Sequence, residues 1–203
     1  MSRIAGLVLA GGLATRMGGG QKALLKMGGT TLLARVLERL TPQVDQVAIN
    51  ANGDLGQYSA FGAPVLPDTL DDFPGPLAGV LAGMRWAERE GCAHILSVAG
   101  DTPFFPKDLA ARMRDAGGTI KMAATRDPER GVMRQPTFAF WPVDLADDLE
   151  AALQGGLRKI VLWADRHGVE TIVYDPDPFD PFFNLNTPGD IVTANGYVEA
   201  YGL

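Results

Sequence analysis

The stretch GLVLAGGLATRMGGGQKALLKMGG, residues 6–29, decides the fold of this chain. An apolar run at residues 4–10, typical of a buried parallel strand, ends abruptly in a loop rich in glycine that also carries Arg16 and Lys22. Ligands of open α/β sheets bind beyond the carboxyl ends of the strands, so this loop lies where a ligand is expected. Glycine lets backbone N–H groups approach phosphate oxygens, and Arg16 and Lys22 supply positive charge. The stretch therefore predicts a polyphosphate site, against the plainer interpretation of a flexible turn with solvated cations.

Two common phosphate loops do not match this stretch. A Walker loop requires Gly-Lys-Ser/Thr, which is missing, and the spacing G-x-G-x-x-G, started from Gly18 and Gly20, meets Ala23 at its third position. The sequence thus disfavours both the P-loop and the dinucleotide-binding interpretations.

Composition limits the remaining classes of protein. The 203 residues are 46% hydrophobic and 21% charged, which predicts one globular domain, and the formal net charge of −6 argues against a non-specific nucleic-acid binder. Cys92 is the only cysteine, so neither a disulfide framework nor a cysteine-based metal site is expected, and a cytoplasmic location is predicted. The apolar runs are shorter than the roughly 20 residues that span a bilayer, so no membrane association is predicted.

Strand patterns alternate with helical patterns along the chain. We expect strands at residues 4–10, 46–50, 63–68, 94–100, 120–126, 136–141 and 169–175, and helices at 31–40, 75–90, 107–117, 143–156, 157–168 and 187–202. This order predicts an α/β fold, a three-layer α/β/α sandwich with a Rossmann-like, mostly parallel sheet. The polar segment at residues 126–136 is predicted to be a mobile loop.

Several polar residues follow predicted strands. Asp101 follows the strand at 94–100, where a carboxylate can hold Mg²⁺, although it can also cap the next helix. Asn184 and Asn186 are two apart, so both can face the same side of an extended segment or cap the turn before a helix. The helix start at 75–79 can present free N–H groups to an anion or pack tightly on the sheet.

The sequence resembles a known family. LAGGLATRMGGGQKALLKMGG is similar to the N-terminal signature of nucleotidyltransferases that activate sugars and cofactors, and its RMGG followed by Lys resembles the molybdenum cofactor guanylyltransferase (MobA) family. Further segments resemble that family in the expected order: INAN (49–52), LPD (66–68), GPLAGVLAGM (75–84), VAGDTPFFP (98–106), QPTFAFW (135–141) and FFNLNTPGD (182–190). One departure is Gly100, where cysteine is commoner in the family.

The resemblance implies a fold of the nucleotide-diphospho-sugar transferase type and transfer of GMP from GTP to molybdopterin, with Mg²⁺. It implies a single domain, residues 1–203, in which residues 1–105 bind GTP and residues 106–203 contribute to the molybdopterin site. Molybdenum-insertion proteins and molybdoenzyme chaperones are the further partners it suggests. The attacking group would be a phosphate of the pterin, so no covalent enzyme intermediate is expected.

The resemblance also implies residue roles. The triphosphate is expected at the catalytic residues Arg16 and Lys22, aided by the backbone of Gly11, Gly18 and Gly19. The guanine and ribose are expected at Leu9, Ala10, Gly12, Asn50 and Asp68. Asp101 is expected to bind the metal ion and act in catalysis, while Asn184 and Asn186 are expected at the pterin or near the metal ion. The role of Lys26 stays open.

Three alternatives remain. A sister family uses CTP, but it tends to carry LAAG where this chain has LAGG at residues 9–12. A sugar-phosphate nucleotidyltransferase is disfavoured by the short chain. A nucleotide or cofactor carrier without turnover is left open by the departure at Gly100.

Overall fold

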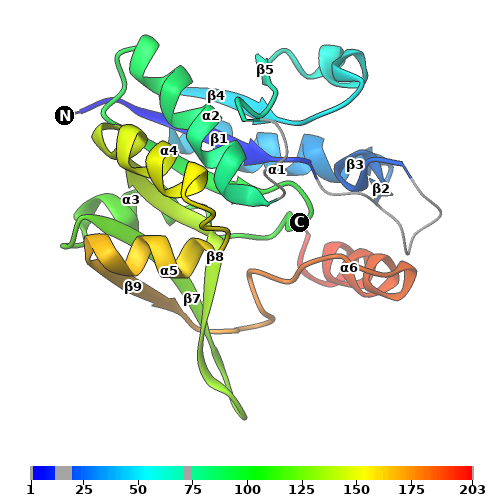
Figure 1. The fold of residues 1–203 in the computed structure, drawn as a ribbon. Coiled ribbons are helices and arrows are strands. Elements are labelled where there is room, and N and C mark those ends of the chain that lie inside the picture. The colour runs from blue at the N-terminus through cyan, green and yellow to red at the C-terminus, as the bar shows by residue number, and fades with distance from the viewer. Residues whose placement is uncertain (1, 12–19, 71–74, 203) are drawn as a thin grey trace.

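A seven-stranded sheet forms the centre of the molecule (Figure 1). The computed structural model describes residues 2–11, 20–70 and 75–202. Across the sheet the strands follow the order β5 (Val65–Leu66), β4 (Gln46–Asn50), β1 (Ile4–Leu9), β6 (His94–Ala99), β8 (Gly131–Pro142), β7 (Ile120–Asp127) and β9 (Val169–Tyr174). Only β8 runs antiparallel to its neighbours among these strands, which confirms the prediction of a mostly parallel sheet.

Helices cover both faces of the sheet, as the predicted three-layer sandwich requires. One face carries α1 (Leu32–Leu40) and α3 (Leu109–Asp115). The other carries α2 (Pro76–Arg89), α4 (Ala146–Gln154) and α5 (Ile160–Ala164). Short 3-10 helices join these elements: η1 (Lys22–Leu24), η2 (Thr41–Gln43), η3 (Leu55–Phe61), η4 (Val143–Leu145) and η5 (Asp165–His167).

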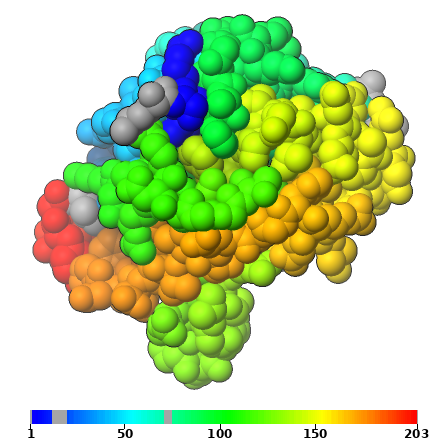
Figure 2. Space-filling model, turned by 90° about the vertical axis from the view of Figure 1, so that its left-hand side faces the viewer, coloured from blue at the N-terminus to red at the C-terminus, as the bar shows by residue number. Residues whose placement is uncertain are grey.

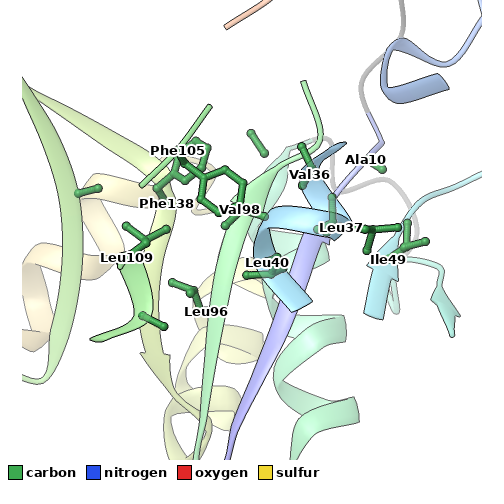
Figure 3. Packing of buried hydrophobic residues seen from close by; sticks show 14 of the residues in the cluster. Ala10, Val36, Leu37, Leu40, Ile49, Leu96, Val98, Phe105, Leu109 and Phe138 are labelled. Carbon is green, nitrogen blue, oxygen red and sulfur yellow. The ribbon is translucent and has the colours of Figure 1, made fainter. Parts of the chain in front are cut away.

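Alternation along the strands explains why both faces are buried. In β1, Val8 packs with Leu40 and the α1–α3 layer, whereas Leu7 packs with the α2–α4–α5 layer. Figure 3 shows the first of these cores, in which Leu40, Leu96 and Phe138 lie between the helices and the sheet. A strand buried on both faces reads as a continuous apolar run, which is why the sequence of β1 predicts it so clearly.

A third, smaller core lies beside the sheet. It joins Met27 and Leu32 to Phe104, Leu185 and Ala194, the last of these in α6 (Pro188–Tyr201). Met27 belongs to the two-stranded hairpin β2 (Lys26–Met27) and β3 (Thr30–Thr31), which the sequence pattern did not predict because each strand has only two residues.

The predicted mobile loop at residues 126–136 is wrong. Most of these residues form the ends of β7 and β8, which pair as a hairpin as far as Asp127 and Gly131 and project from the body of the molecule (Figure 2). The N–H groups of Glu129 and Arg130 donate to Oδ1 of Asp127 and close the turn. Both faces of a projecting hairpin are solvated, so its sequence lacks the apolar alternation of a half-buried strand. The polar, turn-rich sequence therefore resembled that of a loop.

Smaller differences concern element ends. The predicted helix at 157–168 is split into the short α5 and the 3-10 helix η5, and the predicted strand at 136–141 begins earlier, at Gly131. In the parts of the chain that the structure describes, no helix has the length and apolar character needed to cross a membrane.

Candidate functional site

Four neighbouring strands end in a row of polar groups at the carboxyl edge of the sheet. The N–H of Ala10, just beyond β1, donates to the carbonyl of Asn50 at the end of β4 (2.8 Å). On the other side of β1, the N–H of Gly100 donates to the carbonyl of Leu9 (3.0 Å), which brings Asp101 next to the same strand end. With strands spaced by about 4.8 Å, the end of β5 and the end of β6 lie about 14 Å apart. A nucleotide lying along this edge can therefore contact all four strand ends.

Lys22 is the centre of the first group of side chains, the Lys22 cluster, which comprises Lys22, Asp101, Asn184 and Asn186. The Lys22 ammonium donates to Oδ2 of Asp101 (2.5 Å), to Oδ1 of Asn184 (3.0 Å) and to Oδ1 of Asn186 (2.6 Å). Lys22 is only 8% exposed, and a buried ammonium requires such partners. The structure thus brings together four of the residues selected from the sequence.

Local structure holds each member of the Lys22 cluster in place. Lys22 begins the 3-10 helix η1, and the N–H of Leu185 donates to the carbonyl of Asp101 (3.1 Å), which fixes the segment carrying both asparagines. Leu185 is fully buried, so its two neighbours must point away from the core. The helix-capping role considered for Asp101 is wrong, because Asp108 occupies the N-cap of α3 and Asp101 accepts from Lys22 and the Thr102 hydroxyl instead.

Asp190 orders the segment from the other side. Its Oδ2 accepts the N–H groups of Asn186 (2.8 Å) and Thr187 (2.7 Å), while Thr187 caps the start of α6 in return. Burial alone raises the pKa of Asp190, but the N–H groups of Asn186 and Thr187, the Thr187 hydroxyl and the charge of Lys22 outweigh it, so the pKa lies below its usual value. The ionised carboxylate of Asp190 therefore stabilises the position of Asn186.

The second group, the Asp68 cluster, comprises Asn50, Asn52 and Asp68. The Asn50 amide donates to Oδ1 of Asp68 (2.8 Å), and the Asn52 amide donates to Oδ2 of the same carboxylate (2.8 Å). Asn52 also accepts the backbone N–H of Asp68 on its own Oδ1 (2.9 Å). Asp68 is thus held at both carboxylate oxygens and at its backbone, and each oxygen keeps a lone pair for a ligand N–H or O–H.

The sequence analysis gave no role to Asn52, although its amide both donates to the Asp68 carboxylate and accepts the Asp68 backbone N–H. The available signal was the pattern Asn-x-Asn at the end of β4, where Asn50 is the last strand residue and Asn52 follows it. The same spacing recurs at Asn184 and Asn186.

The start of α2 packs against the Asp68 cluster. A Cβ added at Gly79 would lie 2.1 Å from Oδ1 of Asn50 and 2.9 Å from Cδ2 of Leu9. Glycine is therefore required at position 79 for close packing of helix and sheet, which favours the packing interpretation of this segment. The N-cap residue is Gly75, which has no side chain to bond the first N–H groups of α2.

The remaining residues considered from the sequence lie outside the two clusters or outside the described residues. Gly12, Arg16, Gly18 and Gly19 lie outside the described residues. Gly11 is exposed with open space around it, and Lys26 is an exposed residue of β2. At the departure from the family pattern, a Cβ on Gly100 would lie 3.2 Å from both the Leu9 carbonyl and the Ala23 methyl carbon, a tight fit for any larger residue.

The donor atoms of the Lys22 cluster fit a hard divalent cation. One carboxylate oxygen and two amide oxygens converge on a single positive charge, and such oxygens are the ligands that Mg²⁺ prefers. Among the described residues there is no group of three or more His, Cys, Asp or Glu side chains that could hold a metal ion by themselves. A cation here would thus need the amide oxygens, its own waters or substrate oxygens in addition to Asp101.

These features define a nucleotidyltransferase: an α/β sheet with a buried lysine, a carboxylate and two amides at its carboxyl edge, beside a second polar group on the neighbouring strands. The model of the MobA-like NTP transferase domain matches residues 6–169, and the chain belongs to this family. A molybdenum cofactor guanylyltransferase of Rhodopseudomonas palustris is 45% identical over 195 residues, which cover 93% of this chain and 90% of that protein. One of Rhizobium meliloti is 46% identical over 203 residues, covering 95% and 90%.

Solved structures agree with this assignment. The molybdopterin-guanine dinucleotide biosynthesis protein A of Archaeoglobus fulgidus superposes with a TM-score of 0.75 at 25% identity, covering 97% of this chain and 99% of that one. A CMP:2-keto-3-deoxy-manno-octonic acid synthetase solved with CTP has a TM-score of 0.73 at 14% identity, covering all of both chains, which shows a shared fold.

Proposed function

We propose that this protein transfers GMP from GTP to molybdopterin, giving the guanine dinucleotide form of the cofactor and pyrophosphate. The names of its relatives and the match to its family support the reaction. The structural observation that carries the proposal is the convergence of Lys22, Asp101, Asn184 and Asn186 beside the Asp68 cluster on one sheet edge.

We assign one group of residues to the guanine and ribose and a second group to the triphosphate. Asp68 and Asn50, with Leu9, Ala10 and Gly12, receive the guanine and ribose. Lys22 turns its ammonium to the triphosphate, together with Arg16 and the backbone of Gly11, Gly18 and Gly19. A phosphate oxygen of molybdopterin attacks the α-phosphorus of GTP, a new P–O bond forms, and the bond to pyrophosphate breaks. Positioning and charge neutralisation dominate such a step, so no nucleophilic side chain is needed.

Asp101, Asn184 and Asn186 are the residues that would hold Mg²⁺. The ion would supply a Lewis acid for the phosphate oxygens. We assign residues 1–105 to GTP and residues 106–203 to the acceptor, with both halves in one domain. A cytoplasmic location and contacts with molybdenum-insertion proteins or molybdoenzyme chaperones complete the proposal.

Calorimetry with GTP, CTP, ATP and UTP in the presence of Mg²⁺ tests the nucleotide, and pyrophosphate release with molybdopterin tests the reaction. We expect selective GTP binding and release that depends on molybdopterin. A preference for CTP would assign the chain to the cytidylyl sister enzymes, and tight GTP binding without release would identify a carrier. Full turnover by Asp101→Ala would contradict the role of Asp101.

A further inference from the structure

A pocket lies at the base of the projecting β7–β8 hairpin, separate from the residues assigned to GTP. Its volume is about 350 Å³, within the range of small-molecule sites. The walls come from the two strands of the hairpin and from the segment that follows β9: Thr125, Arg126, Asp127, Pro128, Arg130, Met133, Gln135, Pro176 and Asp180.

The pairing of β7 and β8 is irregular beside this pocket. Met122 of β7 pairs with Ala139 of β8, but the next residue, Ala123, pairs with Gln135, so β8 bulges outward around Pro136. Proline cannot donate to a ladder, and a bulge bends and twists its strand. The outer part of the hairpin therefore leaves the plane of the sheet and makes one wall of the pocket, with the Gln135 amide fixed by its bond to the Thr125 hydroxyl (3.2 Å).

The pocket combines two carboxylates, Asp127 and the partly buried Asp180, with two cations, Arg126 and Arg130. Asp180 is half-buried, and its Oδ1 accepts the N–H of Phe182 (2.9 Å), which fixes the direction of the carboxylate. Burial raises the pKa of Asp180, and the negative charge of Asp127 raises it further. A partner that donates N–H groups to the carboxylate relieves this desolvation. Arg126 and Arg130 also line the pocket and can interact with the negatively charged part of a ligand, although Nε of Arg126 also lies 3.7 Å from Oδ1 of Asp175.

The pocket is within reach of the Lys22 cluster. Asp101 follows β6, and Thr125 to Asp127 end β7, which runs in the same direction as β6 on the far side of β8. Asp180 precedes Asn184 by four residues, which limits the separation of their Cα atoms to about 14 Å. Between them the ring of Phe182 is anchored 4.8 Å from Phe138, so this connection is part of the core. One small molecule can thus contact both places.

We infer that this pocket receives the pterin ring system of the acceptor, with Asp180 accepting its adjacent ring N–H and amino groups and the phosphate directed toward Lys22. A pterin is flat, neutral and bicyclic, and its pyrimidine edge presents two donors side by side, which a carboxylate accepts as a pair. The inference rests on the proposed function for the identity of the acceptor, but the recognition of a pterin by this pocket can be measured without turnover.

The test combines Asp180→Asn, which replaces an acceptor atom by a donor, with Met133→Trp, which fills the pocket from a half-exposed position. Asp147→Asn, which removes an exposed carboxylate on α4, is the matched control. Free pterin, followed by its fluorescence, probes the pocket, and calorimetry with GTP and Mg²⁺ probes the nucleotide site.

We expect both pocket variants to raise the Kd for pterin and the KM for molybdopterin about tenfold or more, with the Kd for GTP unchanged. Unchanged pterin and molybdopterin constants in both variants, or a loss of GTP binding in a folded variant, would overturn the inference. A wild-type protein that binds pterin through Asp180 but does not transfer GMP would instead contradict the proposed function and leave the pocket assignment standing.

Discussion

The ammonium nitrogen of Lys22 lies 2.5 Å from a carboxylate oxygen of Asp101, although 79 residues separate them in the sequence. The same nitrogen also contacts Asn184 and Asn186, so one lysine occupies the oxygens that a divalent cation would need. If a divalent cation binds here as proposed, we expect it to compete with the Lys22 ammonium for these oxygens until a triphosphate offers the ammonium other partners.

Replacement of Lys22 by methionine separates the role of the ammonium in nucleotidyl transfer from its competition with a metal ion. We expect Lys22→Met to lower transfer by about 10²–10³-fold, because the leaving pyrophosphate loses a preorganised cation. In the nucleotide-free protein the same variant should bind Mn²⁺ roughly tenfold more tightly, since a positive charge has left the oxygens. Electron paramagnetic resonance of free Mn²⁺ measures this affinity. Lys26→Met, at an exposed position of β2, is the control, and equal Mn²⁺ affinity in wild type and Lys22→Met would contradict the competition.

The two hydrogen bonds between Asn52 and Asp68 predict that Asn52 affects the binding of GTP but not the rate of the chemical step. Asn52→Ala removes two hydrogen bonds to Asp68, so we expect the Kd for GTP to rise about fivefold to tenfold while kcat changes less than twofold. Gln57→Ala, which removes an exposed amide contact to Asp54, should leave both constants unchanged. A fall in kcat with an unchanged Kd would show that Asn52 acts elsewhere.

Gly79 and Gly196 form a matched pair of helical glycines. A methyl group at Gly79 meets Asn50 and Leu9, whereas one at Gly196 in α6 has open space. We expect Gly79→Ala to lower the free energy of unfolding by about 1–3 kcal/mol through overpacking. Gly196→Ala should raise it by about 0.5–1 kcal/mol, because alanine favours a helix. Urea unfolding measures both, and equal effects would contradict the packing assigned to Gly79.

Asp190 predicts a pH dependence of stability. Its pKa is lower in the folded protein than in the unfolded chain, so its contribution is complete above the unfolded value of about 4 and is lost as the pH falls through the folded pKa. We expect Asp190→Asn to lower the free energy of unfolding by about 1 kcal/mol at pH 7. The difference from wild type should shrink in urea titrations below about pH 4, and a difference independent of pH would contradict the role of the charge.

Local patterns predicted the regular part of this fold well. The apolar runs of β1 and β6 predict both strands from neighbouring residues, and the structure confirms them. The outer part of the β7–β8 hairpin, residues 126–136, was missed because most of its residues are exposed and because Pro136 is atypical of a strand interior. The convergence of Asn184 and Asn186 on Lys22 could be inferred only from the family resemblance. The two asparagines follow Lys22 by 162 and 164 positions in the sequence, and no local pattern links residues so far apart.

That separation has a consequence for how the protein is made. Synthesis proceeds from the N-terminus, so the ribosome completes Lys22 and Asp101 long before either asparagine exists. β1, β4, β5 and β6 can pair early, yet the lysine finds two of its three oxygen partners only when the last part of the chain emerges. A nascent or prematurely terminated chain can therefore form part of the sheet but lacks the complete Lys22 cluster until residue 186 has been added.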